Sequence, residues 1–402
     1  MQFSDIIGQE EVKQHLSELV QHNRLSHALL FLGKEGSGAL PLALAFAQYV
    51  VCEKVAGKGT QNEGTISMFG DQPQTTNYKP QTDSCGTCPS CLKSKQLVHP
   101  DIHYSYPTVT KKVGEKPIAT DFITEWREFI KLSPYGNLYD WIEQIKEKEN
   151  SQGKITASEC EDIIRKLSLK SFESEYKILV MWMPEELEKE GNKLLKIIEE
   201  PPPNTLFILV AENEEAMLST IVSRCQLIRI PALETQAVEQ ALIGRNKTEP
   251  TIARQIAGVS EGNYREALQL VQHSEEDWLA LLREWMNAIL KTGPLAQSRW
   301  VEEISRLGRE KQKQFLRYFT HLLEQSIRLR VLENGSDMPG AERDFAERLN
   351  KIAAIEQQQA ISEELEKAIY YIERNANAKM LFHALTIKLY HIIQDKVVFL
   401  ID

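Results

Sequence analysis

The residues best suited to chemistry in this sequence are cysteines. Three of them fall within seven residues, in the pattern Cys85-x-x-Cys88-x-x-Cys91, and Cys52 lies upstream as a fourth sulfur. Four thiolates satisfy a tetrahedral zinc ion and leave no position open for water, so such a site is structural and not catalytic. An iron–sulfur cluster also uses this spacing, but nothing else here suggests redox chemistry. We predict one zinc ion held by Cys52, Cys85, Cys88 and Cys91.

The other possible metal ligands are less suited. His99 and His103 lie near the cysteines, but His99 precedes Pro100-Asp101 and is expected to lead into a strand. Cys160 and Cys225 have no neighbouring thiol in the sequence, and we interpret them as plain buried residues.

A glycine-rich loop, GKEGSGAL from Gly33 to Leu40, is similar to the phosphate-binding pattern Gly-x-x-x-x-Gly-Lys-Ser/Thr. Gly33, Gly36 and Gly38 suit a loop whose backbone N–H groups cradle phosphates. The lysine that neutralises the terminal phosphates and the hydroxyl that holds magnesium are replaced by Ala39 and Leu40. We predict that the chain alone hydrolyses no ATP, while passive nucleotide binding stays open.

A second feature of ATPases is also missing. The apolar run Ile178–Trp182 ends in Met183-Pro184, where ATPases of this build keep an Asp-Glu pair for magnesium. Glu185 and Glu186 follow, and a shift in register could supply one of them. The missing acid pair is therefore weaker evidence against ATP hydrolysis than the altered loop.

Ser223-Arg224-Cys225 lies between an apolar pair and an expected strand. Arg224 could project from the subunit edge and contact the γ-phosphate of ATP bound to a neighbouring subunit. The alternative is an ordinary surface arginine.

The elements that would position these residues alternate between strands and helices. Short apolar runs predict buried strands at Ala28–Leu32, Ile178–Trp182, Leu206–Val210 and Leu227–Ile230. A helix is expected from about Pro41, and another carries the apolar residues Leu187, Leu194, Leu195 and Ile198. Strands alternating with helices predict a parallel sheet covered by helices.

Two stretches interrupt this alternation. Residues from about 56 to 83 are rich in Gly, Gln, Thr and Asn and are expected to be flexible. The stretch from Thr108 to Lys154 carries an apolar stripe at helical spacing, so we expect ordered helices there. Beyond Pro231 only helices are expected, first a small unit at 237–272 and then a longer all-helical region.

Composition limits the class of protein. With 402 residues, 42% of them hydrophobic, the chain is long enough for two or three domains with cores of their own. It has no run of about 18 apolar residues and no signal-like N-terminus, so we expect a cytoplasmic protein with no membrane contact. A net charge of −10 argues against a chain that coats DNA by bulk charge.

In chain order, these features resemble bacterial clamp-loader subunits of the AAA+ family, and most of all the delta-prime subunits of DNA polymerase III. The ordered set comprises Ile7-Gly8-Gln9, Leu25 to Phe31, the four cysteines, Asn192 to Lys196, Glu199 to Pro202, and Ser223 to Cys225. Residues Gly262 to Leu268 resemble the sensor of the family's lid, with Arg265 as its arginine, and Asn375-Ala376-Asn377 resembles the start of the last collar helix.

The resemblance implies an architecture. An α/β P-loop AAA+ module, with helices on both faces of a parallel sheet of about five strands, would occupy residues 1–232. It would include a zinc module at about 50–95 and the insertion at about 108–154, which departs from the family's pattern. A helical lid at 233–274 and an all-α collar at 275–402, which joins subunits into a ring, would follow.

The resemblance also implies a function. In this family the loader opens the sliding clamp and places it on primed DNA, with ATP bound by gamma or tau subunits. A delta-prime subunit would assemble with gamma/tau and delta, and its Arg224 would enter the ATP site of a neighbouring subunit. Gly33, Gly36, Gly38 and Arg265 would be the remnants of this subunit's own nucleotide site.

Two alternatives stay open. An active ATPase of the gamma/tau type is disfavoured by Ala39 and Leu40. A zinc-dependent DNA-binding module is disfavoured because few basic residues flank the cysteines beyond Lys93 and Lys95.

Overall fold

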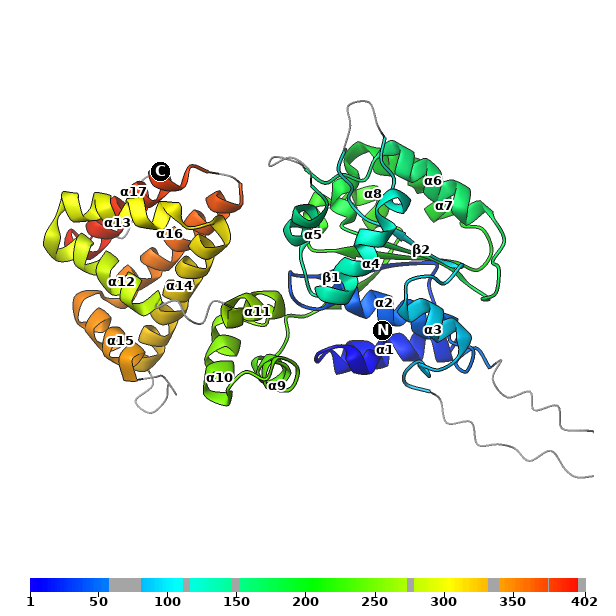
Figure 1. Ribbon diagram of the computed structural model, residues 1–402, viewed down its shortest axis with the longest axis horizontal. Helices are drawn as coiled ribbons and strands as arrows, with labels where there is room; N and C mark the ends of the chain where they lie inside the picture. The colour runs from blue at the N-terminus through cyan, green and yellow to red at the C-terminus, as the bar shows by residue number, and fades with distance from the viewer. Residues whose placement is uncertain are drawn as a thin grey trace, which may run out of the picture. The chain divides into compact units, whose positions relative to one another are not determined.

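The computed structural model describes residues 1–57, 81–110, 116–146, 152–272, 278–331, 340–374 and 376–396 (Figure 1). It contains two compact units, Met1–Gln269 and Leu270–Asp402. Most of the stretch expected to be flexible, residues 58–80, lies outside the described residues. The division into three domains at 232 and 274 stays a prediction.

The first unit is built on a parallel sheet of five strands in the order β2-β3-β4-β1-β5. The strands are β1 (Ala28–Gly33), β2 (Ile102–Ser105), β3 (Lys177–Trp182), β4 (Thr205–Ala211) and β5 (Gln226–Ile230). The central strands are apolar on both faces, as expected where each face is covered. The predicted parallel sheet is confirmed.

Helices cover both faces of this sheet. Side chains alternate along β1, so that Leu29 and Phe31 join one core and Ala28 and Leu30 join the other. The first core also contains residues of α1 (Glu10–Gln21), α2 (Ala39–Val51), α4 (Ile123–Leu132) and α5 (Leu138–Ile145). The second contains residues of α6 (Ala157–Ser168), a 3-10 helix (Pro184–Leu194), α7 (Leu195–Glu199) and α8 (Ser219–Val222).

The connection between β3 and β4 differs from the single helix expected there. Residues Pro184–Leu194 form a 3-10 helix, and only Leu195–Glu199 is α-helical. Pro184 lacks a backbone N–H, and Gly191 is packed so closely that an added Cβ would lie 2.8 Å from Leu218.

The described part of the stretch between Thr108 and Lys154 contains ordered helices, as predicted. A short 3-10 helix (Ala119–Phe122) leads into α4, and α5 follows. The ends of the stretch are joined by a bridge in which Thr108 and Lys154 exchange two backbone hydrogen bonds of 2.9 and 3.0 Å. Its aromatic residues pack on the sheet, with Trp126 stacked 4.1 Å from Tyr106.

The small helical unit comprises α9 (Thr235–Asn246), α10 (Pro250–Val259) and α11 (Tyr264–Gln272). We call α9 to α11 the lid. At Gly262 the backbone has φ of +81°, and an added Cβ would lie 2.3 Å from the carbonyl oxygen of Leu233. Only glycine allows this close approach between the lid and the chain leaving the sheet.

The described part of the second unit is helical throughout, as predicted. Its helices are α12 (Trp278–Asn287), a π-helical turn (Ala288–Thr292), α13 (Pro294–Arg306), α14 (Arg309–Val331), α15 (Gly340–Ile352), α16 (Ile355–Glu373) and α17 (Ala378–Gln394). Trp285 and Trp300 stack in its core at 4.5 Å. Asn377 caps α17 by accepting from the N–H of Met380, while Asn375 lies outside the described residues. None of the described helices is long and apolar enough to cross a membrane.

Candidate metal centre and degenerate nucleotide site

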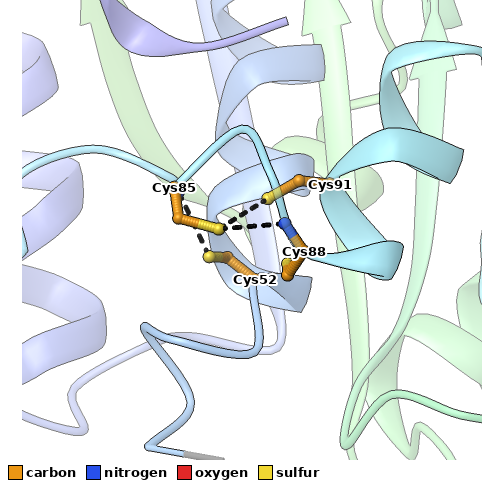
Figure 2. A group of neighbouring side chains, drawn as sticks. All are labelled: Cys52, Cys85, Cys88 and Cys91. Carbon is orange, nitrogen blue, oxygen red and sulfur yellow. Dashed lines mark hydrogen bonds between the residues drawn. The ribbon is translucent and has the colours of Figure 1, made fainter. Parts of the chain in front are cut away.

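The four predicted cysteines face one another in the structure (Figure 2). Cys52 follows the last residue of α2, Cys88 precedes α3 (Pro89–Lys95), and Cys91 lies in the first turn of α3. All four sulfur atoms lie within 4.8 Å of one another, and those of Cys85 and Cys91 are 3.9 Å apart. Zinc–sulfur bonds of about 2.3 Å in a tetrahedron separate the sulfurs by about 3.8 Å. The donor set therefore fits zinc, with no position left for water.

Hydrogen bonds favour the thiolate form of Cys52, the form that a metal binds. The thiol of Cys91 and several backbone N–H groups hold the pKa of Cys52 at about 4. Among them, the N–H of Cys85 donates to the Cys52 sulfur over 3.3 Å. The pKa of Cys91 is raised in turn by its hydrogen bond to Cys52, because the two sulfurs share one proton. A metal ion would replace that proton.

The cysteines join segments that are distant in the sequence. The carboxylate of Asp83, just before Cys85, accepts from the backbone N–H of Phe3 over 2.9 Å. The side-chain amide of Gln2 donates to the carbonyl of Ser84 over 2.6 Å. A metal at this point would fix the N-terminal segment, the end of α2 and α3 together, which is a structural role.

His99 and His103 are not part of this group. In the described residues, the cysteines alone make up the cluster. The Nδ1 atom of His99 accepts from the N–H of Asp101, and its Nε2 atom lies 3.3 Å from a carboxylate oxygen of Glu173. Burial lowers the pKa of both histidines. The prediction that His99 leads into a strand is confirmed, since β2 begins at Ile102.

The two remaining cysteines are isolated. Cys160 is fully buried, as interpreted from the sequence, whereas Cys225 is only partly buried, so that interpretation was wrong for Cys225. Burial raises the pKa of Cys160 to about 12 and that of Cys225 to about 11. Neither thiol is activated as a nucleophile.

The glycine loop joins β1 to α2, which confirms the predicted strand, loop and helix. Gly36 and Gly38 have φ of +72° and +89°, a region that side chains other than glycine rarely adopt. An added Cβ at Gly38 would lie 3.0 Å from the ring of Tyr135. The loop therefore has the backbone form of a phosphate cradle, but neighbouring side chains press against it.

The two residues at the places of the catalytic lysine and the magnesium-binding hydroxyl belong to the core. Ala39 is 8% exposed and Leu40 is 4% exposed. The cavity beside the loop, lined in part by Tyr135, Gly136 and Trp182, has a volume of about 20 Å³. That is room for about one water molecule beside the loop.

The end of β3 carries an aromatic residue where an acid would be needed. The ring of Trp182 lies 5.4 Å from Trp126 and 5.7 Å from Phe129. The carboxylate of Glu185 accepts from the backbone N–H groups of Glu212 and Asn213 at 2.6 and 2.9 Å. Glu185 is therefore engaged by the loop after β4, which argues against its supply by a shift in register.

Arg224 follows α8, and its side chain is 35% exposed. Its Nη1 atom donates to the carbonyl of Thr220 over 2.7 Å, and its Nη2 atom pairs with the carboxylate of Glu199. Both contacts lie at the surface, where an ion pair contributes little to stability.

Arg265 lies in the first turn of α11, and only 5% of its side chain is exposed. It contacts Glu35 in the glycine loop and Asp140 in α5. The structure therefore brings Arg265 to the loop of Gly33, Gly36 and Gly38, while Arg224 and the cysteines each lie in separate surroundings.

The sequence did not indicate the side chains that surround the loop and Arg265, which are Glu35, Tyr135, Asn137, Asp140 and Asn263. One signal was present, because Asn137-x-x-Asp140 is a capping pattern that predicts the start of α5. That pattern indicates a helix start and says nothing about contact with the loop or the lid.

The sequence matches a family of known proteins. The family model for DNA polymerase III, delta subunit, matches residues 8–67 and 58–234, more than half of the chain. The delta-prime subunit of Bacillus subtilis is 25% identical over 268 residues, which cover 66% of this chain and 60% of that protein. The delta-prime subunit of Escherichia coli is 25% identical over 210 residues, 52% of this chain and 43% of that protein.

Tau subunits are also similar. The tau subunit of Bacillus subtilis is 25% identical over 304 residues, 73% of this chain and 41% of that protein. The chain thus matches less than two thirds of the length of each of these relatives.

A gamma subunit-related protein of Thermotoga maritima aligns with 93% of this chain and 98% of its own, at 14% identity and a TM-score of 0.36. That similarity is too low to support an argument. The family match over residues 8–234 is decisive, and with delta-prime subunits of several bacteria among its relatives, this chain belongs to the DNA polymerase III delta-prime subunit family.

Proposed function

We propose that the chain is a non-hydrolysing clamp-loader subunit of DNA polymerase III that works in the cytoplasm. It assembles with gamma or tau subunits and with delta, and the complex places the sliding clamp on primed DNA. Arg224 reaches the γ-phosphate of ATP on a neighbouring subunit and stabilises the charge of the transition state there. Residues 1–232, 233–274 and 275–402 serve as AAA+ module, lid and oligomerising collar.

The observation that carries this proposal is the state of the glycine loop. Ala39 and Leu40 stand where the loop would need the lysine and the hydroxyl that phosphoryl transfer requires, and both are buried in the core. Trp182 and the engaged Glu185 support the same reading at the end of β3. A subunit that cannot use its own site contributes to ATP turnover only through a neighbour, and Arg224 is the candidate for that contact.

A second candidate function is an active ATPase of the gamma/tau type, which the similarity to tau subunits favours. Robust magnesium-dependent ATP turnover by the isolated chain would support that candidate and reject ours.

The metal has a structural part in this proposal. We infer that Cys52, Cys85, Cys88 and Cys91 hold one zinc ion per chain, which supports the N-terminal segment and takes no part in catalysis.

The test is reconstitution. The chain is co-purified with gamma or tau and delta, and ATP turnover is measured with and without clamp and primed DNA. In the Arg224→Ala variant we expect normal assembly and loss of most turnover at the adjacent site, because a trans arginine contributes about 10³-fold or more. Arg165→Ala is the matched control, since Arg165 is another exposed arginine that pairs with a carboxylate, Asp162. Unchanged turnover in Arg224→Ala would reject the finger role.

A further inference from the structure

The lid arginine is bound by two carboxylates of its own chain. Arg265 donates from Nε and Nη2 to both carboxylate oxygens of Asp140, at 2.5 and 2.6 Å. Its Nη1 atom donates to Glu35 over 3.0 Å. These contacts join α11 of the lid, α5 of the insertion and the glycine loop. A bidentate arginine–carboxylate pair is among the stronger polar contacts in proteins.

Amide side chains complete the arrangement around Glu35. Asn137 of the insertion donates to one oxygen of Glu35 over 3.0 Å, and Asn263 of the lid donates to the other over 3.2 Å. Both oxygens of Glu35, a residue inside the glycine loop, are therefore engaged: one accepts from Asn137 of the insertion, and the other accepts from both Asn263 and Arg265 of the lid.

The backbone of the loop is in direct contact with the lid. The N–H of Tyr264 donates to the carbonyl of Gly36 over 3.2 Å. An added Cβ at Gly36 would lie 1.9 Å from a side-chain oxygen of Asn263 and 2.9 Å from its Cα. The rings of Tyr135 and Tyr264 meet edge to face at 5.0 Å. The lid and the insertion therefore both pack against the loop, and a cavity of about 20 Å³ remains beside it.

We propose that the insertion is an internal occupant of the degenerate nucleotide site. The carboxylates of Asp140 and Glu35 bind Arg265 where the phosphates of a nucleotide would otherwise attract a lid arginine. Tyr135 and Asn137 fill the space beside the loop. The lid is thereby held closed on the loop in the absence of nucleotide, and the site excludes ADP and ATP. This inference does not depend on any role of Arg224.

Because Arg265 is buried, the closed lid should be sensitive to a single change of charge among its partners. Its side chain is 5% exposed, whereas Asp140 and Glu35 are 28% and 25% exposed. An arginine that loses its bidentate carboxylate in such a place keeps Glu35 as its charged partner, but two of its buried N–H donors lose a charged acceptor, which favours an open lid. Asp140→Asn removes the charge but keeps an oxygen that can accept from the N–H of Asn137 at the start of α5.

The experiment measures amide hydrogen exchange in the full chain without nucleotide, and the Tyr264 amide reports on contact between lid and loop. We expect Asp140→Asn to speed exchange at Tyr264 by about tenfold or more, the range for a hydrogen bond to a charged group. Glu143→Gln is the matched control, because it removes the same charge from the same helix, where Glu143 pairs with Lys146 three residues further along the chain. In Glu143→Gln, exchange of the Tyr264 amide is expected to be as slow as in wild type.

A double-mutant cycle tests whether the effect of Asp140→Asn comes from its contact with Arg265 or from a general loss of stability. Asp140→Asn should add nothing in an Arg265→Gln background, because both changes break the same contact. Equal exchange in wild type and Asp140→Asn, or additive effects in the cycle, would overturn the proposal. Millimolar ADP, with and without magnesium, should leave exchange at Tyr264 and in the loop unchanged in wild type, and protection by ADP would also overturn it.

Discussion

Arg224 is ion-paired with Glu199, the last residue of α7, a helix that lies beside α8. The two side chains are 35% and 44% exposed, so water screens the attraction and the pair is weak. Glu199 also belongs to the Glu-Glu-Pro-Pro segment on which the resemblance to clamp-loader subunits rested. Arg224, the candidate finger, is thus held against its own subunit by a weak ion pair and by its hydrogen bond to the carbonyl of Thr220.

Glu199 and the phosphates of a neighbour's ATP would compete for the same guanidinium. In the reconstituted complex, we therefore expect Glu199→Gln to raise ATP turnover by about twofold to fivefold, matching the energy of an exposed ion pair. Steady-state ATPase assays with clamp and primed DNA measure this. Glu161→Gln, which breaks another exposed pair with Lys193, should leave turnover unchanged. A loss of turnover in Glu199→Gln would mean that Glu199 positions the arginine and does not restrain it.

Removal of one sulfur should abolish metal binding. Metal analysis of the purified chain is expected to give about one zinc ion in wild type and none in Cys91→Ser, since a tetrahedral site needs all four ligands. The variant should lose on the order of 4 kcal/mol of stability where free zinc exceeds its dissociation constant a thousandfold. Cys225→Ser, outside the cluster, should keep its zinc. A folded, metal-free wild-type protein would contradict the structural role.

The parts of the fold that follow local rules could be predicted from the sequence. The apolar run at Ala28–Leu32 followed by glycines indicated β1, the loop and α2, because a buried parallel strand is apolar on both faces. The spacing of Cys85, Cys88 and Cys91 likewise predicted a cluster, since a short loop and one helical turn bring such residues together.

Contacts between distant segments could not be predicted. Asp140 and Arg265 are 125 residues apart in the sequence, and no local pattern in either segment indicates the other. The irregular helix from Pro184 to Leu194 was also missed, because apolar periodicity alone does not distinguish a 3-10 helix from an α-helix.

His103 should make the first unit less stable in mild acid. Burial, with a smaller effect from Lys166, lowers its pKa to about 4, against about 6.5 in the unfolded chain. Below pH 6.5 the unfolded state binds the proton first, so the free energy of unfolding falls as the pH drops from 6.5 to 4, by about 2–3 kcal/mol.

Replacement of His103 by Gln should remove this part of the pH dependence. Urea unfolding of the full chain at several pH values, compared between wild type and His103→Gln, measures the difference. The exposed His22 supplies a control, since His22→Gln should follow the wild-type curve. Parallel curves for wild type and His103→Gln would show that this histidine is not held neutral.

Gly36 should tolerate no side chain. Its φ of +72° disfavours any other residue, and a Cβ there would collide with the side chain and backbone of Asn263. We expect Gly36→Ala to lower the free energy of unfolding of the first unit by about 1–3 kcal/mol, from backbone strain and overpacking together. Gly244→Ala is the matched control, because Gly244 lies in α9 of the same lid with no atom within 4 Å of an added Cβ. It should stabilise the chain by up to about 1 kcal/mol, since alanine favours a helix more than glycine does. Wild-type stability in Gly36→Ala would mean that the lid does not rest on the loop in solution.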